Sequence, residues 1–471
     1  MKKLTFIACL ICAFDFIQAQ EVDSTVLSYD DFYTLVVQNH PLARQIGLLS
    51  EQARANLRMA RGNFDPKVGF QWQKKDFGDT EYYDKVYAAL KVPTWFGLTP
   101  EVGMSQRDGQ FLNPEDFISE STDNQQVFAG LNMSLGRGLF IDERRATLAQ
   151  AKLFTQLTEA EQVKQLNDLL LAAAQDYWNW YEKYYNYEVV NQSMNIAQDI
   201  FARTKLAYTY GEVAAIDTVQ AKANLLTRKT QLVQSRIDLR ESALKLSTYL
   251  WKEDGTPLEI RPTTRPQQPE VRTDVELAYL LDLATQQHPE LVKLRVKNES
   301  LGVERRMSVE NLKPRLDVRY VVLDQPVSPE GELSGLDLEE NYAFGIDFSF
   351  PLLLRKERAK LDQVDLKIEQ NNLAQNDKER SIINKINADY FALVNTEDLI
   401  DQQLQVAQNY QLLVNAERLN LASGESDLFK LNNQLDKLLE SQSKVIKANA
   451  DYQKLYVKLL WSAGVEQLQL E

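Results

Sequence analysis

The sequence has 471 residues and a formal net charge of −14. Its length suits two or three ordinary domains. The acidic balance argues against nucleic acid as a partner, because binding a polyanion requires a basic surface. After residue 20, no stretch approaches the roughly 18 consecutive apolar residues of a membrane-spanning helix, so insertion into a membrane would require β-strands.

The N-terminus has the pattern of a secretory signal peptide. Two lysines precede an apolar run over residues 4–17, and Ala19 ends a small-residue cleavage site. We therefore expect residues 1–19 to be a signal peptide. Cys9 and Cys12 both lie inside it, so the mature protein has no cysteine and must gain its stability from packing or assembly.

The rest of the chain is duplicated. Landmarks of the first half recur in the same order in the second: His40-Pro41 as His288-Pro289, Arg145 as Arg358, and Gly211 as Gly424. The offset is about 248 residues at the first landmark and about 213 at the later ones. The first copy therefore contains an insertion of about 35 residues. We place it between Pro66 and Leu131, where turn-forming residues cluster and insertions are tolerated.

Each copy ends in a tract that predicts a long helical hairpin. Residues 139–254 contain no proline and a single glycine, Gly211. From residue 352 onward proline is again absent, and Gly424 is the internal glycine. The first helix of each hairpin would have about 70 residues and a length of roughly 100 Å, which exceeds the width of a compact domain. Helices of this length are usually coiled coils.

The spacing of apolar residues agrees with a coiled-coil seam. Apolar side chains in both copies are separated by alternating steps of three and four residues, except that Glu397 occupies one position of the series in the second copy. In the second copy they are Ile383, Ile386, Tyr390, Leu393, Ile400, Leu404 and Ala407. In the first copy they are Leu170, Ala173, Tyr177, Trp180, Tyr184 and Tyr187. We interpret the aromatic members as core residues and not as a ligand site.

Alternating segments ahead of each hairpin predict β-strands, within residues 65–135 in the first copy and over 315–323 and 341–350 in the second. One apolar and one polar face fit either a half-buried soluble sheet or a lipid-facing barrel. The long helices offer no second layer for the apolar face, which favours lipid. Four strands cannot close a barrel and open edges are not tolerated in lipid, so several chains would have to share one barrel. The inserted hairpin at about 82–108 either adds barrel strands or caps the pore.

These features together resemble the TolC family of outer-membrane efflux proteins over about residues 30–465. The matching elements are Asn39-His40-Pro41, Phe64-Asp65-Pro66, Ser349-Phe350-Pro351-Leu352, Arg358-Ala359-x-Leu361 and the glycines Gly211 and Gly424. The resemblance implies an α+β membrane protein in which a duplicated unit of strand pair and long helical hairpin builds a shared trimeric β-barrel continued by an α-helical barrel. The order of segments is a signal peptide (1–19), a first repeat (20–254, tip near 211), a proline-rich linker (255–274), a second repeat (275–465, tip near 424) and a tail (466–471).

The resemblance also implies a function. It predicts a homotrimeric channel in the outer membrane of a Gram-negative cell, with a periplasmic helical tunnel and outer-membrane lipid around its strands. Its partners would be a periplasmic adaptor (membrane fusion) protein and an inner-membrane pump, in tripartite efflux or type I secretion. The alternative is a periplasmic or surface coiled-coil scaffold without a pore. A periplasmic adaptor subunit is a third possibility, although such subunits have one helical hairpin and this chain has two.

Candidate functional residues lie at the two predicted tips. Three copies of an acidic side chain would form a ring that attracts cations and could hold a constriction shut. Candidates for this gate are Asp217, Glu425, Asp427 and Asp436. Candidates for docking an adaptor are Tyr208, Gly211, Glu212, Val213, Leu421, Ala422, Gly424, Ser426 and Leu428. We also expect the glycines to end one helix and Asp217 or Ser426 to cap the next.

No pattern in the sequence points to an enzyme. The two histidines, His40 and His288, occupy equivalent positions before prolines, where the start of a helix explains them better than a metal or catalytic pair. Gly136-Arg137-Gly138 is too short for a nucleotide fingerprint. We therefore predict no catalytic residue, no metal and no cofactor.

Overall fold

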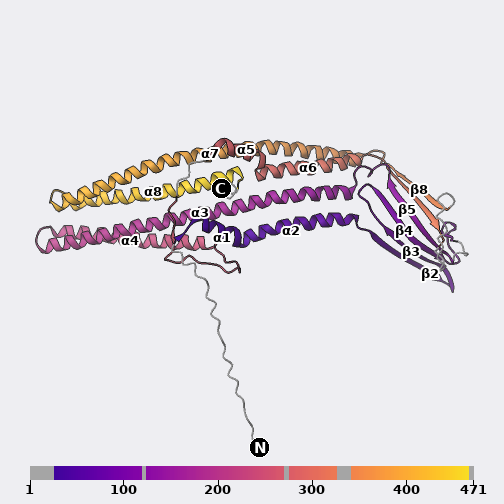
Figure 1. Ribbon diagram of the computed structural model, residues 1–471, viewed down its shortest axis with the longest axis horizontal. Helices are drawn as coiled ribbons and strands as arrows, with labels where there is room; N and C mark the ends of the chain where they lie inside the picture. The colour runs from indigo at the N-terminus through magenta and orange to yellow at the C-terminus, as the bar shows by residue number, and fades with distance from the viewer. Residues whose placement is uncertain (1–25, 119–122, 270–274, 326–340, 466–471) are drawn as a thin grey trace, which may run out of the picture. The chain divides into compact units, whose positions relative to one another are not determined.

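The structure is a computed structural model that describes residues 26–118, 123–269, 275–325 and 341–465 (Figure 1). The predicted signal peptide and the predicted tail lie outside these residues. The chain divides into two compact units, and each takes segments from both sequence repeats. The tip unit consists of Met1–Asn39, Ala173–Val271 and Leu399–Asp451. The sheet unit consists of His40–Ala172, Arg272–Asp398 and Tyr452–Glu471.

In the sheet unit, six strands from the described residues form one antiparallel sheet in the order β2-β3-β4-β5-β7-β8 (Figure 1). The strands are β2 (Lys67–Phe77), β3 (Thr80–Lys91), β4 (Leu98–Asp108), β5 (Gln125–Ser134), β7 (Arg315–Asp324) and β8 (Tyr342–Ser349). The inserted hairpin supplies β3 and β4, which lie between β2 and β5. Of the two roles that the sequence left open, the insertion therefore extends the sheet.

The two faces of the sheet differ as the alternation predicted. Residues opposite one another on neighbouring strands share a face, and Phe70 of β2 is opposite Ala88, which is opposite Met104. On the edge strand β2, the side chains of Val68, Phe70 and Trp72 are 81%, 71% and 62% exposed. Phe344, Ile346 and Phe348 on β8 are exposed as well. Large apolar side chains thus line one face of the two outermost strands and are exposed there.

The other face of the sheet packs against itself. The ring of Phe128 stacks on that of Tyr87 with their centroids 5.5 Å apart. Gly103 makes room for this pair, since a Cβ atom there would lie 2.6 Å from Cζ of Phe128. Beside them the buried carboxylate of Glu101 accepts hydrogen bonds from the Tyr87 hydroxyl and, at 3.1 Å, from the Arg319 guanidinium. On this face, aromatic rings therefore stack on one another, and the buried carboxylate has hydrogen-bond donors from two neighbouring side chains.

The sheet unit also contains short helices that lie beside long ones. The long helices α3 (Glu143–Thr209) and α7 (Arg355–Ala422) have 67 and 68 residues, or about 100 Å each, as the sequence predicted. The Gln162 amide of α3 donates to the carbonyl of Ile46 at 2.8 Å, and the Asn371 amide of α7 donates to that of Leu294 at 2.9 Å. Ile46 and Leu294 are repeat-equivalent, so the long helix contacts the same position of the short helix in both copies, although Asn371 lies one turn before Gln375, the equivalent of Gln162. The short helices are α2 (Pro41–Arg61), α5 (Leu277–Gln287) and α6 (Pro289–Glu310), with 3-10 turns η1 (Gly62–Phe64) and η2 (Pro114–Asp116).

In the tip unit, an aromatic core anchors two short extended segments. Tyr177 and Trp180 of α3 are fully buried, which confirms their interpretation as core residues. The Tyr177 hydroxyl donates to the Leu27 carbonyl at 2.8 Å, and the Tyr185 hydroxyl donates to that of Pro266 at 3.2 Å. These carbonyls belong to β1 (Val26–Leu27) and β6 (Arg265–Pro266), which pair in parallel. The helices of this unit are α1 (Tyr29–Asn39), α4 (Ala215–Ser247), most of α8 (Leu428–Ala463) and the second parts of α3 and α7.

The predicted seam of α7 is buried at one position per heptad. Ile386, Leu393, Ile400 and Ala407 are buried, and Val414 continues the series. Ile383 and Tyr390 are half-buried. The prediction is wrong for Leu404, which is 44% exposed. In α3, Leu170 and Ala173 are buried, whereas Tyr184 and Tyr187 are half-buried. The contact stripe within one chain is therefore narrower than the apolar stripe in the sequence.

No helix in the described ranges carries an apolar run long enough to cross a lipid bilayer.

Both histidines cap helices. Nδ1 of His40 accepts the Leu42 N–H, and Nδ1 of His288 accepts the Glu290 N–H, each at 3.2 Å. The prolines that follow occupy the first helical positions, where a missing N–H costs nothing. Burial lowers the pKa of His288 to about 4. The imidazole is therefore neutral near pH 7, as an acceptor must be.

Because His288 has a lower pKa in the folded protein than in the unfolded chain, the unfolded chain binds more protons below pH 6.5. Stability should fall as the pH drops from about 6.5 to about 4. His288→Gln should flatten this part of the curve of urea midpoint against pH. The same substitution at the half-buried His40 is the matched control and should change it less. Equal slopes for the wild type and His288→Gln would contradict the assignment.

Candidate functional site

The two helical hairpins turn in the same way. Gly211 and Gly424 have φ angles of +77° and +79°, the left-handed region that glycine adopts without strain. In the first turn the N–H groups of Gly211 and Glu212 donate back to Tyr208 and Ala207 at 3.0 Å each. Gly424 and Glu425 donate to Leu421 and Asn420 at 3.2 and 2.9 Å. This pair of backbone hydrogen bonds is the Schellman motif, and it confirms that the glycines end α3 and α7.

The starts of the second helices differ from our expectation. Asp217 is the third residue of α4 and not its cap, although its carboxylate accepts the Ala214 N–H at 3.0 Å. At α8, Asp427 is the capping residue, because its carboxylate accepts the Lys430 N–H at 2.8 Å. Ser426 donates its hydroxyl to the Glu417 carboxylate instead. Predicting Ser426 as a cap was therefore wrong by one residue.

Beneath the turns, the two hairpins share one apolar core. Ile200 of α3 and Ala221 of α4 pack with Val414 of α7 and with four leucines of α8, namely Leu428, Leu431, Leu435 and Leu438. Leu421 is half-buried against the same cluster. Leu428 is only 8% exposed, so the prediction that it docks a partner is wrong. Its neighbour Phe429, which points about 100° away around the helix, is 69% exposed.

An ion pair joins the second helices of the two hairpins. The guanidinium of Arg228 on α4 donates to the carboxylate of Asp436 on α8, and also to the Gln231 side chain at 3.0 Å. Arg228 is only 2% exposed, whereas the Asp436 side chain is 61% exposed. One turn closer to the tips, the Asn224 amide donates to Asn432. Since a buried guanidinium is costly without a partner, Asp436 fixes the two hairpins to each other at this level.

Apolar side chains are exposed around both turns. At the first tip, Tyr210 is 73% exposed, and Tyr208, Ile216 and Val219 are exposed too. At the second tip Phe429 is accompanied by the exposed Leu419. Of the predicted docking residues, Glu212, Ala422 and both glycines are exposed, whereas Val213 and Ser426 are half-buried. Water-exposed groups of this kind suit a protein partner.

Solved structures share this arrangement across nearly the whole chain. The Campylobacter jejuni CmeC outer membrane channel superposes with a TM-score of 0.64 at 14% identity, covering 93% of this chain and 86% of that one. The Vibrio cholerae outer membrane protein VceC gives 0.64 at 13% identity, covering 93% and 96%. This chain has the fold of the TolC family. The open-state Neisseria gonorrhoeae MtrE outer membrane channel gives 0.63 at 12% identity, covering 92% and 88%. No protein-family model and no curated protein sequence matches the chain.

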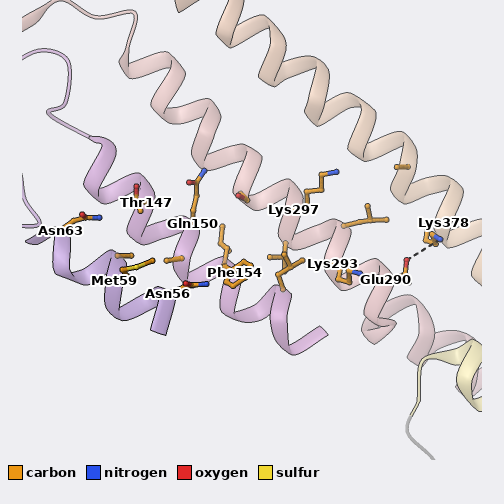
Figure 2. Close-up of a pocket in the computed structure, with 18 of the residues that line it drawn as sticks. Asn56, Met59, Asn63, Thr147, Gln150, Phe154, Glu290, Lys293, Lys297 and Lys378 are labelled. Carbon is orange, nitrogen blue, oxygen red and sulfur yellow. Dashed lines mark ion pairs between the residues drawn. The ribbon is translucent and has the colours of Figure 1, made fainter. Parts of the chain in front are cut away.

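The described residues of this TolC-fold chain hold no cluster of histidine, cysteine or acidic side chains that could bind a metal. The sheet unit contains an open cavity of about 1010 Å³ among α2, α3, α6 and α7 (Figure 2). Phe154 and Met59 contribute apolar surface, and two of the lysines that line it are paired, Lys293 with Glu161 at 2.6 Å and Lys378 with Glu290 at 3.6 Å. The cavity is lined by none of the predicted site residues.

Of the four gate candidates, Asp436 alone makes a described ion pair between the hairpins. Asp427 caps α8, Asp217 accepts the Ala214 N–H from within the first turn of α4, and Glu425 is exposed at its turn. Sequence reasoning missed Arg228, although a signal was present. Ala221, Leu225, Arg228 and Leu232 are spaced by four, three and four residues, so a basic side chain occupies an otherwise apolar seam.

The turns provide a test of the TolC-type tips. Gly211→Ala or Gly424→Ala should destabilise the turn by about 1 kcal/mol, because a Cβ atom strains a left-handed residue. No atom lies within 4 Å of the added Cβ at either position, so the effect is one of backbone conformation alone. Amide hydrogen exchange at the tip should accelerate about fivefold. Gly302→Ala, within α6 and equally unhindered, is the control and should not accelerate exchange. Unchanged exchange in the tip variants would contradict the assigned strain.

Proposed function

We propose that the chain is a subunit of an outer-membrane channel that passively conducts substrates delivered by an inner-membrane pump. The observation that carries this proposal is the combination of a sheet whose edge strands expose large apolar side chains with two tandem helical hairpins. Exposing these apolar side chains to water is unfavourable in free energy, and contact with lipid would remove them from water. The shared fold with CmeC, VceC and MtrE, whose names describe outer membrane proteins or channels, supports this function.

The assembly would be a homotrimer in the outer membrane of a Gram-negative cell, with the helices forming a periplasmic tunnel. The signal peptide predicted from the sequence supports export. The exposed apolar groups at the hairpin turns, Tyr210 and Phe429 above all, would dock a periplasmic adaptor. Tripartite efflux and type I secretion both use such a channel, and the proposal covers both. Conduction requires a wet lumen and a gate, so no catalytic group is needed.

The pair between Arg228 and Asp436 would hold the channel entrance closed. Opening a tunnel at its tips requires one hairpin to move away from the other. Such a movement would separate the buried guanidinium from its carboxylate and open the shared leucine core. A hydrogen bond between charged groups stabilises by roughly 1.5–3 kcal/mol, enough to bias a closed state strongly. A trimer would place three such ion pairs around its symmetry axis.

Single-channel recording in a planar bilayer tests the gate. Asp436→Asn should raise the open probability about tenfold, the equivalent of roughly 1.4 kcal/mol. Asp427→Asn removes an equal charge while asparagine still caps the helix, so it should leave the open probability unchanged. Glu440→Gln, which breaks only pairs within α8, is a second control. An open probability that is unchanged in Asp436→Asn would contradict the role of the ion pair in gating. If folded trimers form no channel at all, the scaffold without a pore becomes the favoured function.

A separate substitution tests docking. Phe429→Ser should sensitise host cells to exported toxic compounds, because the exposed ring would no longer contact the adaptor. Conductance of the purified channel should stay the same, since the leucine core beneath is intact. Val233→Ser, at an exposed apolar position on α4, is the control and should leave resistance unchanged. Sensitisation by both variants, or by neither, would contradict a specific role for the tip.

A further inference from the structure

A second cavity of the sheet unit has a basic lining that the proposed function leaves unexplained. Its volume is about 370 Å³, within the range of small-molecule sites. It lies among α3, the start of α6, α7 and the C-terminal end of α8. Its charged lining residues are three lysines and two acids, Lys164, Lys378, Lys385, Asp168 and Glu290. This lysine pocket therefore carries one net positive charge, in a chain whose own net charge is −14.

Both carboxylates of the lysine pocket are already paired. Asp168 accepts hydrogen bonds from Lys164 at 3.0 Å and from the Trp461 indole at 2.7 Å. Glu290 forms ion pairs with Lys378 at 3.6 Å and with Lys164 at 3.7 Å (Figure 2 shows the first). These contacts account for two of the three lysines as well as for both acids.

Lys385 is the lysine whose charge is not balanced. In the part of the chain that the structure describes, it takes part in no ion pair, and the carboxylate of Asp389 one turn along α7 is paired with Lys458 at 2.7 Å. The Lys385 ammonium lies instead over the Trp461 ring, 3.6 Å from its centroid. Burial lowers the pKa of Lys385, although the charge of Asp389 opposes this shift. An anion in the pocket would supply the partner that this ammonium lacks.

A hydrogen-bond donor is also unused in the wall of the lysine pocket. Asn167 lines the pocket and is only 7% exposed. Its side-chain nitrogen has no hydrogen-bond partner among the described residues. Because a buried N–H without an acceptor is unfavourable, native structures usually provide one. Turning this amide toward the pocket would let a bound anion accept from it.

The first repeat does without these basic side chains. The offset of 213 residues still holds in this region, because both repeats contain the same lysine–aspartate ion pair, Lys245 with Asp176 and Lys458 with Asp389. The equivalent of Lys378 is Gln165. The equivalent of Lys385 is Ala172. A long helix of this fold therefore does not require a lysine at either position, which favours a role in binding over a role in packing.

We propose that the lysine pocket binds a small organic monocarboxylate. Its carboxylate would lie at Lys385 and Asn167 and would neutralise the single net charge of the pocket. A dianion is disfavoured, because two acidic side chains line the same cavity. The pocket is larger than a carboxylate group alone, and Ile382 and Trp461 provide apolar surface for the carbon skeleton of the ligand.

A bound carboxylate would connect helices of both repeats. Asn167 belongs to α3, whereas Lys385 belongs to α7 and Trp461 to α8. A ligand that binds only the folded state stabilises that state. The stability of the sheet unit would therefore rise with the concentration of the organic acid around the protein.

Calorimetric titration of the full-length protein with benzoate, at constant ionic strength, tests the proposal. One benzoate should bind per chain, and its neutral analogue benzamide should not bind. Lys385→Met should weaken binding about tenfold, because a hydrogen bond between charged groups is lost. Lys385→Arg keeps the charge and should retain binding, which separates loss of the charge from loss of the fold. Lys297→Met, at an exposed lysine of α6 outside the pocket, is the control and should bind as the wild type does.

Two further measurements locate the ligand. Asn167→Leu, a substitution of similar size, should weaken benzoate binding about fivefold through the loss of one hydrogen bond. In the wild type, benzoate at its half-saturating concentration should slow the acetylation of Lys385 about twofold, because half of the sites are occupied. Mass spectrometry of the same sample should show that acetylation of Lys297 is unchanged.

The other outcomes would overturn the proposal. Equal binding of benzamide would show that the pocket does not select an anion, and tighter binding of inorganic phosphate would replace the carboxylate as its ligand. No saturable binding at millimolar benzoate would contradict the site itself. Glu466 follows the last described residue, and Glu466→Gln should leave benzoate binding unchanged. Tighter binding in that variant would identify the Glu466 carboxylate, and not a free ligand, as the occupant.

Discussion

Every backbone N–H and C=O group needs a hydrogen-bond partner wherever water is excluded, and most features of this chain follow from that requirement. A helix pairs its own backbone N–H and C=O groups except at its ends. There, glycine turns, two histidines and two aspartates supply the missing hydrogen-bond partners. A sheet satisfies itself except at its edges. The chain solves the first problem internally, and it leaves one edge of β2 and one edge of β8 without a partner strand among the described residues.

The helical part is stabilised across the repeat boundary as well as within each repeat. The leucines of α8 pack on Ile200 and Ala221, which belong to the first hairpin, and Arg228 reaches Asp436 in the second. Neither hairpin has a complete core alone. Separating the two hairpins would therefore expose the leucines of α8 and leave the guanidinium of Arg228 without its carboxylate.

Patterns of local chemistry predicted most of the fold. Proline-free tracts with one glycine located both hairpins, and the alternation of apolar and polar residues located the strands. Both signals are local, because the spacing of apolar residues differs between a helix and a strand. Contacts between distant segments were harder to predict. Leu428 and Phe429 are both apolar, and only the position of the partner helices decides which one is buried. Asp436 was predicted as a gate residue without its partner, because Arg228 lies about 200 residues earlier. Whether β3 and β4 join the sheet also depended on pairing that no local pattern fixes.

The place of the inserted hairpin limits how proteins of this fold can change over evolution. A single inserted strand would reverse the direction of every later strand and carry the start of α3 to the opposite side of the sheet. A hairpin returns the chain to the side from which it left, so β5 and everything after it keep their places. An inserted hairpin thus widens the sheet by two strands while the order and direction of the elements that follow stay the same.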